Sequence, residues 1–131
     1  MRRRSRRLLA VLIAATIAVG LATRQFPAAF GPFLAEHAGD ALWAVVVWLC
    51  YAFLLPVRST WTVTLLAAVT AALVECSQLS DAGWLVWLRN LPGGRLVLGD
   101  GFVAMDFVRY GVGIGLAAAA ELLLGRRAAR D

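Results

Sequence analysis

The stretch Trp61–Leu79 reads WTVTLLAAVTAALVECSQL, and the stretch Phe102–Leu124 reads FVAMDFVRYGVGIGLAAAAELLL. Both are long and apolar enough to cross a bilayer as helices, because a transmembrane helix needs about 20 residues, with a working range of about 17–25. Two shorter apolar runs, Leu8–Ala22 and Ala41–Leu55, reach this length when flanking residues join the helix. We therefore predict an all-α integral membrane protein with four transmembrane helices, at about residues 8–23, 40–55, 61–79 and 102–124.

The composition and the prolines agree with this reading. The chain is 61% hydrophobic and 16% charged, whereas soluble domains are about 45–50% apolar and about 25% charged. Proline is costly inside a helix, and all four prolines fall between the predicted spans, at Pro27, Pro32, Pro56 and Pro92. A length of 131 residues leaves room for one domain, so we take residues 1–131 as a single membrane domain.

Arginine is distributed unevenly between the two sides of this arrangement. Nine arginines belong to the N-terminus, the connection after the second span and the C-terminus, whereas Arg24, Arg89 and Arg95 belong to the other side. Basic residues are retained on the cytoplasmic side of a bacterial inner membrane. We therefore expect both termini in the cytoplasm, and the connections at residues 23–40 and 80–101 facing outward. The same placement accounts for the net charge of +5 without a nucleic-acid partner.

The first apolar run has a second interpretation. The residues MRRRSRR, followed by a short apolar run and Gly20-Leu21-Ala22, are also compatible with a cleavable signal peptide. The rest of the chain is itself rich in membrane spans, with no soluble domain to export. We therefore expect an uncleaved first helix, and cleavage stays open as the alternative.

Both outer connections are rich in large apolar side chains, which are unusual in solvated loops. These are Phe26, Phe30 and Phe33 in the first connection, and Trp84, Leu85, Trp87 and Leu88 in the second. Tryptophan prefers the headgroup region of a bilayer. We therefore predict short interfacial segments in the two outer loops, the second one capped at its start by Asp81.

Several ionisable and polar residues lie within the predicted spans. An ionised side chain at the centre of a membrane helix costs about 2.5–3.5 kcal/mol on insertion scales. The third span nevertheless contains Glu75 and Gln78, the fourth contains Asp106 and Arg109, and Asp40 opens the second. On the fourth, Asp106, Arg109 and Tyr110 follow the i, i+3, i+4 spacing of one helix face.

These residues are predicted to reach one layer of the membrane. With a rise of about 1.5 Å per residue, Glu75 lies about 21 Å above the inner end of the third span. In a hydrocarbon core about 30 Å thick, Asp106 and Arg109 lie at about 24 and about 20 Å. We therefore expect the third and fourth helices to be adjacent and antiparallel. Glu75 or Gln78 should then lie within hydrogen-bonding distance of Asp106 or Arg109.

Some of these residues belong to stretches that resemble a known family. The chain resembles the small bacterial membrane proteins called domain of unknown function 2809 over most of residues 20–118. The similar stretches are Phe26-Pro27, Ala38–Trp43 (AGDALW), Val74–Leu79 (VECSQL) and Leu98–Phe102 (LGDGF) with Asp106. The resemblance implies a helical membrane fold with polar residues facing outward, and it implies no activity.

A more distant resemblance is to the VanZ-type proteins, which are associated with glycopeptide resistance. Their pattern is Glu-x-x-Gln, a later Arg, and Asp-x-x-x-polar-x-x-Gly. In this chain the pattern falls on Glu75, Gln78, Arg95, Asp106, Tyr110 and Gly113, and Tyr110 stands where we expect Asn.

The polar cluster has two interpretations. Arg109 can bridge Glu75 and Asp106 and simply fasten two helices, or the cluster can line an outward-facing pocket. Asp40, Glu75 and Asp106 outnumber the single arginine, which favours a site. The candidate ligand-binding residues are Asp40, Glu75, Gln78, Arg95, Asp106, Arg109 and Tyr110.

The expected function is to bind a lipid or headgroup ligand in maintenance of the cell envelope. The expected partners are membrane lipid and a lipid-linked envelope ligand, and a homo-oligomer stays open. The first alternative is a small proton- or ion-coupled transporter, and the second is a purely structural cluster. We expect no enzyme, cofactor or metal, because the only histidine is His37 and no catalytic or metal-ligand spacing occurs.

The arginine count predicts the membrane topology. A fluorescent-protein fusion after Asp131 should fluoresce, and an alkaline phosphatase fusion at the same position should be inactive, because both termini are expected in the cytoplasm. An active phosphatase after Asp131 would contradict the four-helix arrangement.

Overall fold

The structure, a computed structural model, is built from six helices over residues 4–127, the part of the chain that it describes. The helices are α1 (Arg6–Gln25), α2 (Pro27–Leu54), α3 (Thr60–Ser77), α4 (Gly83–Asn90), α5 (Gly94–Leu98) and α6 (Met105–Arg127). Four of them are long and apolar enough to cross a membrane: α1, α2, α3 and the Met105–Gly125 part of α6. The predicted class is therefore confirmed, and the chain is an all-α, multi-pass membrane protein.

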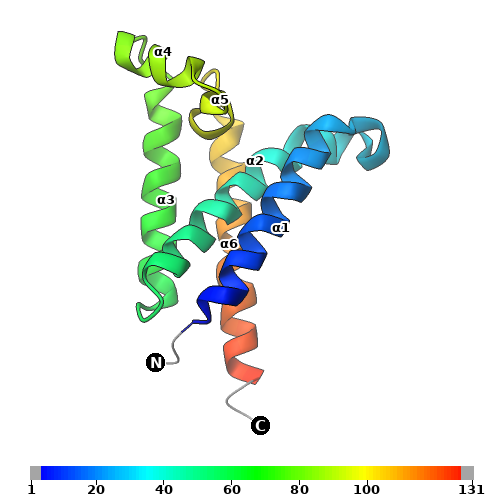
Figure 1. Ribbon diagram of the computed structural model, residues 1–131, viewed down its shortest axis with the longest axis vertical. Coiled ribbons are helices and arrows are strands. Elements are labelled where there is room, and N and C mark those ends of the chain that lie inside the picture. The colour runs from blue at the N-terminus through cyan, green and yellow to red at the C-terminus, as the bar shows by residue number, and fades with distance from the viewer. Residues whose placement is uncertain (1–3, 128–131) are drawn as a thin grey trace.

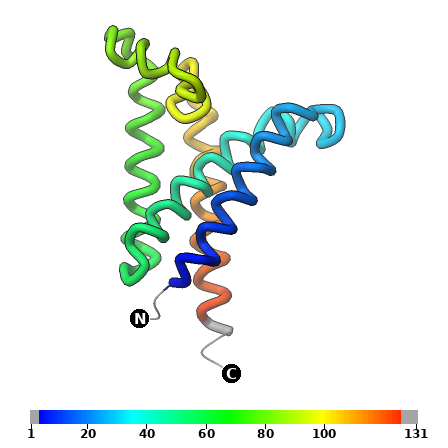
Figure 2. Tube along the Cα trace, in the orientation of Figure 1, coloured from blue at the N-terminus to red at the C-terminus, as the bar shows by residue number. Residues whose placement is uncertain are grey.

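Helix α2 is the centre of the arrangement. It packs against α1, α3 and α6, and α3 packs in turn against α6. Figure 1 shows α1 and α2 as a long antiparallel hairpin that crosses in front of α6, with α3 beside it. The trace in Figure 2 brings the start of α1, the α2–α3 turn and the end of α6 to one end of the molecule. The short helices α4 and α5 lie at the other end.

The hairpin contains a bend that the sequence did not reveal. Gly31 has φ +80° inside α2, and Pro32 begins the part of the helix after this kink, which runs on to Leu54. Asp40 consequently lies inside this helix, so the expectation that Asp40 opens the second helix is wrong. Proline has no N–H to leave unpaired in a first helical turn, so the helix can begin at Pro32, well before the apolar run.

Small side chains and a few hydrogen bonds hold the central helices together. The core combines Trp48 of α2 and Ile114 of α6 with a set of small residues: Ala44, Ala52, Val63, Ala67, Ala71 and Ala118. Trp48 Nε1 donates to Thr64 Oγ1 at 3.0 Å, and Tyr51 OH shares a 2.7 Å hydrogen bond with Thr70 Oγ1. Lipid tails are as apolar as the helices, so the hydrophobic effect does not drive helices together within a membrane. Helices associate there through small residues at their contacts and through buried polar pairs.

The second outer connection forms a cap of two short helices. Arg89 of α4 donates to the carbonyl oxygens of Ser77 at 2.6 Å and Ser80 at 3.2 Å, and so satisfies the end of α3. Leu85 faces inward, whereas Trp84 and Trp87 are exposed, as expected of a helix at headgroup depth. Helix α4 begins after Ala82, so Asp81 is not its cap.

Helices α2 and α6 approach most closely at Gly113. A Cβ atom added there would lie 2.1 Å from the carbonyl oxygen of Ala41. Gly111 and Gly115 differ, since an added Cβ would meet nothing within 4 Å. Only Gly113 of these three is therefore required for packing between the described helices.

The Gly113→Ala substitution should lower the free energy of unfolding by about 1–3 kcal/mol, because the methyl group forces the α2 and α6 backbones apart. Reversible unfolding in mixed detergent micelles measures this. Gly111→Ala is the matched control, and it should cause no loss of stability, since its methyl group enters open space. Equal losses in both variants would show that close packing at residue 113 is not what matters.

Candidate polar binding site

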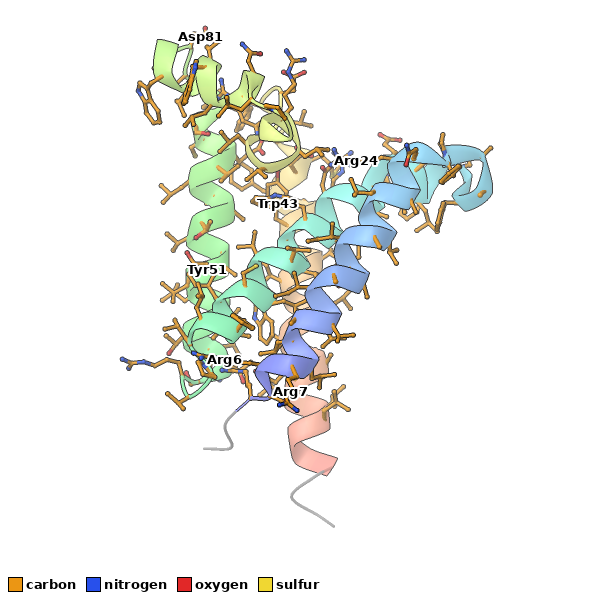
Figure 3. All side chains as sticks on the ribbon, in the orientation of Figure 1. Arg6, Arg7, Arg24, Trp43, Tyr51 and Asp81 are labelled. Atoms are coloured by element: carbon orange, nitrogen blue, oxygen red, sulfur yellow. The ribbon has the colours of Figure 1, made fainter. Side chains whose placement is uncertain are left out.

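The polar residues gather where α2, α3 and α6 meet beneath α5. Figure 3 labels Arg24 and Trp43 toward this end of the α1–α2 hairpin, and Tyr51 and Arg6 toward the opposite end. The site is built from two groups of contacts, one centred on Arg109 and the other on Glu75. Each group includes one residue of α6: Arg109 belongs to the first group, and its neighbour Tyr110 belongs to the second.

Arg109 joins α6 to α2. Its Nη1 contacts Asp106 Oδ1 within the helix and lies 3.3 Å from Asp40 Oδ2 of α2. Its Nε donates to His37 Nδ1 at 3.0 Å, and Nη2 lies 3.7 Å from Glu36 Oε1. The whole guanidinium is thus surrounded by acceptors. His37, which the sequence analysis left aside, is one of them.

Asp40 has a second arginine partner. Arg24, at the end of α1, lies 3.0 Å from Asp40 Oδ1 through its Nη2. The side chain reaches Asp40 by crossing Gly39, where an added Cβ would lie 2.7 Å from Arg24 Nε. The expected shortage of arginine is therefore smaller than predicted, because Asp40 is paired with both Arg24 and Arg109. The sequence signal for this contact is weak, since 16 positions separate the two residues.

Glu75 forms the second group of contacts. Its side chain is fully buried, at 0% exposure. Oε1 accepts from the Val103 amide at 2.8 Å, and Oε2 accepts from Tyr110 OH and Gln78 Nε2, each at 3.1 Å. These bonds fasten α3 to the beginning of α6. The three donors replace the water that a buried carboxylate loses.

The partners of Glu75 differ from the expected ones. The third and fourth spanning helices do pack together, but among the described residues Glu75 bonds Tyr110 and Val103 instead of Asp106 or Arg109. Consecutive residues of an α-helix point about 100° apart. Tyr110 therefore faces α3 while Arg109 faces α2. The expectation that Glu75 or Gln78 bonds Asp106 or Arg109 is wrong, and so is the interpretation in which Arg109 bridges Glu75 and Asp106.

The loop between α5 and α6 closes over Gln78. Gln78 Oε1 accepts from the Gly101 amide at 3.1 Å. Gly99 has φ +74°, and an added Cβ would lie 2.3 Å from Gln78 Nε2, so the backbone touches the side chain directly. Arg95 of α5 is exposed, and its Nη1 lies 3.2 Å from Oδ2 of Asp100 in the same loop.

A pocket of about 300 Å³ opens between these groups. Five of the seven predicted residues line it: Asp40, Gln78, Arg95, Asp106 and Tyr110. Glu75 and Arg109 stand behind this lining and position it. Sequence reasoning missed the remaining lining residues, which are Arg24, Trp43, Leu96, Val97, Gly99, Asp100 and Gly101. Among the described residues, no group of three or more His, Cys, Asp or Glu side chains is placed to hold a metal ion.

A separate polar contact lies at the opposite end of the helices. Glu121 of α6 accepts from Arg4, with Nη2 to Oε2 at 2.8 Å, and from Thr60 Oγ1 at 2.7 Å. Arg4 also donates to the carbonyl oxygens of Leu55 and Arg58. This contact ties the start of the chain to the α2–α3 turn and to α6. Apolar core residues, among them Ala67, lie between the two polar layers.

One comparison with known proteins places the chain. The family model described as "Protein of unknown function (DUF2809)" matches residues 29–114. This range holds α3, α4, α5, nearly all of α2 and the first part of α6, and thus every pocket residue except Arg24. No solved structure matches the chain.

Substitution of Arg109 by Leu should lower the free energy of unfolding by about 3–5 kcal/mol, because it leaves buried Asp106 without its cation. The double variant Arg109→Leu, Asp106→Asn should recover much of that loss, since Asp40 keeps Arg24 as its partner. Unfolding in mixed micelles measures both. If the second substitution recovers nothing, an unpaired carboxylate is not the cause of the loss.

Proposed function

Since this chain belongs to the DUF2809 family, which is described only as proteins of unknown function, we propose its function from the geometry of its pocket. The protein is a binding protein of the bacterial inner membrane. Its pocket takes the polar headgroup of a lipid or of a lipid-linked envelope ligand. The observation that carries the proposal is a pocket of about 300 Å³ at one end of the spanning helices, which is lined by aspartates as well as by arginines.

A purely structural cluster would not need this pocket. The Arg109 and Glu75 contacts already fasten α6 to α2 and α3. Asp40 and Asp106 lie in the spanning helices α2 and α6 and still line the pocket. Ionisable groups within spanning helices that face an opening are characteristic of sites for ligands. The opening beside these two carboxylates therefore supports binding.

The position of the pocket favours a ligand from the outer leaflet. The pocket lies at the end that carries α4, whose exposed Trp84 and Trp87 suit headgroup depth. The arginine-rich ends of the chain favour the cytoplasm. With that orientation the pocket opens outward, where headgroups of envelope lipids are available. The distant VanZ-type pattern at Glu75, Gln78 and Asp106 agrees with a role in the envelope.

Transport and catalysis have less support. A proton- or ion-coupled transporter needs its acidic site to be reached from both faces, and the core between the two polar layers is dominated by small apolar side chains such as Val63 and Ala67. We also propose that the protein is not an enzyme. Its histidine, His37, accepts a hydrogen bond from Arg109 and does not line the pocket, and the pocket pairs its acids with arginines.

Lipid retention tests this proposal. The protein should be purified from nanodiscs that hold phosphatidylethanolamine, phosphatidylglycerol and cardiolipin, and its bound lipid counted by native mass spectrometry. The double variant Arg24→Gln, Arg95→Gln should retain several-fold less of the tightly held lipid, because it removes both pocket arginines. Arg58→Gln, exposed at the far end, is the control and should retain as much as the wild type. Equal retention in all three proteins would overturn the proposal.

A further inference from the structure

We infer that the pocket takes a headgroup that carries a primary ammonium group and a phosphate together, as in phosphoethanolamine. This inference rests on the proposed function, since it names the ligand class of the same pocket. It is carried by three features of the site: the excess of carboxylates over arginines, the acceptors on its acidic wall and the accessibility of its arginines.

Acidic side chains outnumber arginines around the site. Arg24, Arg95 and Arg109 stand against Asp40, Asp100 and Asp106, and two further carboxylates lie close by: Glu75 behind the lining and Glu36 at 3.7 Å from Arg109. A purely anionic ligand would add to this excess, whereas a headgroup that brings an ammonium group together with its phosphate does not. The excess of carboxylates therefore favours a ligand with a positive group.

The acidic wall suits a primary ammonium group. Asp106 is only 8% exposed, yet it lines the pocket, with Oδ1 held by Arg109. Asp40 lines the same wall. A primary ammonium group has three N–H donors for such carboxylate oxygens. A trimethylammonium group has none and is usually held by a cage of aromatic faces. Here Trp43 and Tyr110 lie against each other, with ring centroids 5.2 Å apart, and form no cage.

The basic wall suits the phosphate. Arg24 has 42% of its side chain exposed and Arg95 has 62%, so both guanidinium groups are accessible. Each is now paired with a carboxylate, Arg24 with Asp40 and Arg95 with Asp100. Arginine binds phosphate oxygens with two parallel hydrogen bonds.

Binding is therefore an exchange of ion pairs. Arg24 leaves Asp40 for the phosphate, and the ammonium group takes its place at Asp40. The number of ion pairs does not fall, because each separated protein charge gains a ligand charge of opposite sign. A ligand with a phosphate alone would take Arg24 from Asp40 and leave that carboxylate to Arg109 alone, and a ligand with an ammonium group alone would leave Arg24 without a partner.

The headgroup series tests the inference on the wild-type protein, so the outcome does not depend on whether a variant folds. The full-length protein in detergent micelles should be titrated with dihexanoyl phosphatidylethanolamine, phosphatidylcholine and phosphatidylglycerol, followed by tryptophan fluorescence and native mass spectrometry. We expect phosphatidylethanolamine to bind about tenfold more tightly than the other two. Equal or tighter binding of phosphatidylglycerol would overturn the zwitterion, and equal or tighter binding of phosphatidylcholine would overturn the primary ammonium group, while both results leave headgroup binding intact. Failure of all three to bind would overturn the proposed function as well.

Two further arms sharpen the result. Free glycerophosphoethanolamine, the phosphodiester headgroup without its acyl chains, should compete with the lipid. Competition at equal concentration identifies a soluble ligand, and weaker competition identifies the lipid. Lack of competition by glycerophosphoethanolamine, with inorganic phosphate competing, would count against the inference. Asp40→Asn should reduce the preference for phosphatidylethanolamine to about threefold or less. Asp81→Asn, an exposed aspartate outside the pocket, should leave it at about tenfold.

Discussion

Two neighbouring residues of α6 hold this bundle together, because their side chains leave the helix in directions about 100° apart. Arg109 reaches Asp40 on α2, and Tyr110 reaches Glu75 on α3. In a membrane, polar groups find no water, so each must find its partner within the protein. One short segment of α6 thus determines which face of α2 and which face of α3 turn inward.

The pocket is a consequence of this arrangement. Gly113 brings α6 against the backbone of α2, while Glu75 and Gln78 draw the loop around Gly101 and Val103 over the end of α3. Helices that meet closely below, and a loop that closes from above, leave a polar volume between them. The buried contacts hold the lining in place, whereas Arg24 and Arg95 keep much of their side chains exposed.

The two ends of the bundle carry polar contacts of different kinds. At the end with the chain termini, Arg4 and Thr60 both bond Glu121, and this contact ties the ends of four helices together. At the pocket end, the described residues form more ion pairs, and several of the paired groups are partly accessible. An intramembrane charge is retained only where it stabilises packing or serves a ligand. The contact at Glu121 stabilises packing and needs no opening, whereas the charged groups at the other end line an open pocket.

The sequence by itself determined the membrane class, the four spanning helices, the gathering of polar residues at one end of those helices and five of the residues that line the pocket. These follow from hydrophobic length and helical rise, which are local properties of the chain. Only the tertiary structure decided that Arg109 pairs with α2 instead of α3, that Asp40 lies inside its helix, and that Arg24 crosses Gly39 to reach Asp40. Pairing depends on the rotation of each helix about its axis, and a rotation of one residue changes the partner without altering hydropathy or depth.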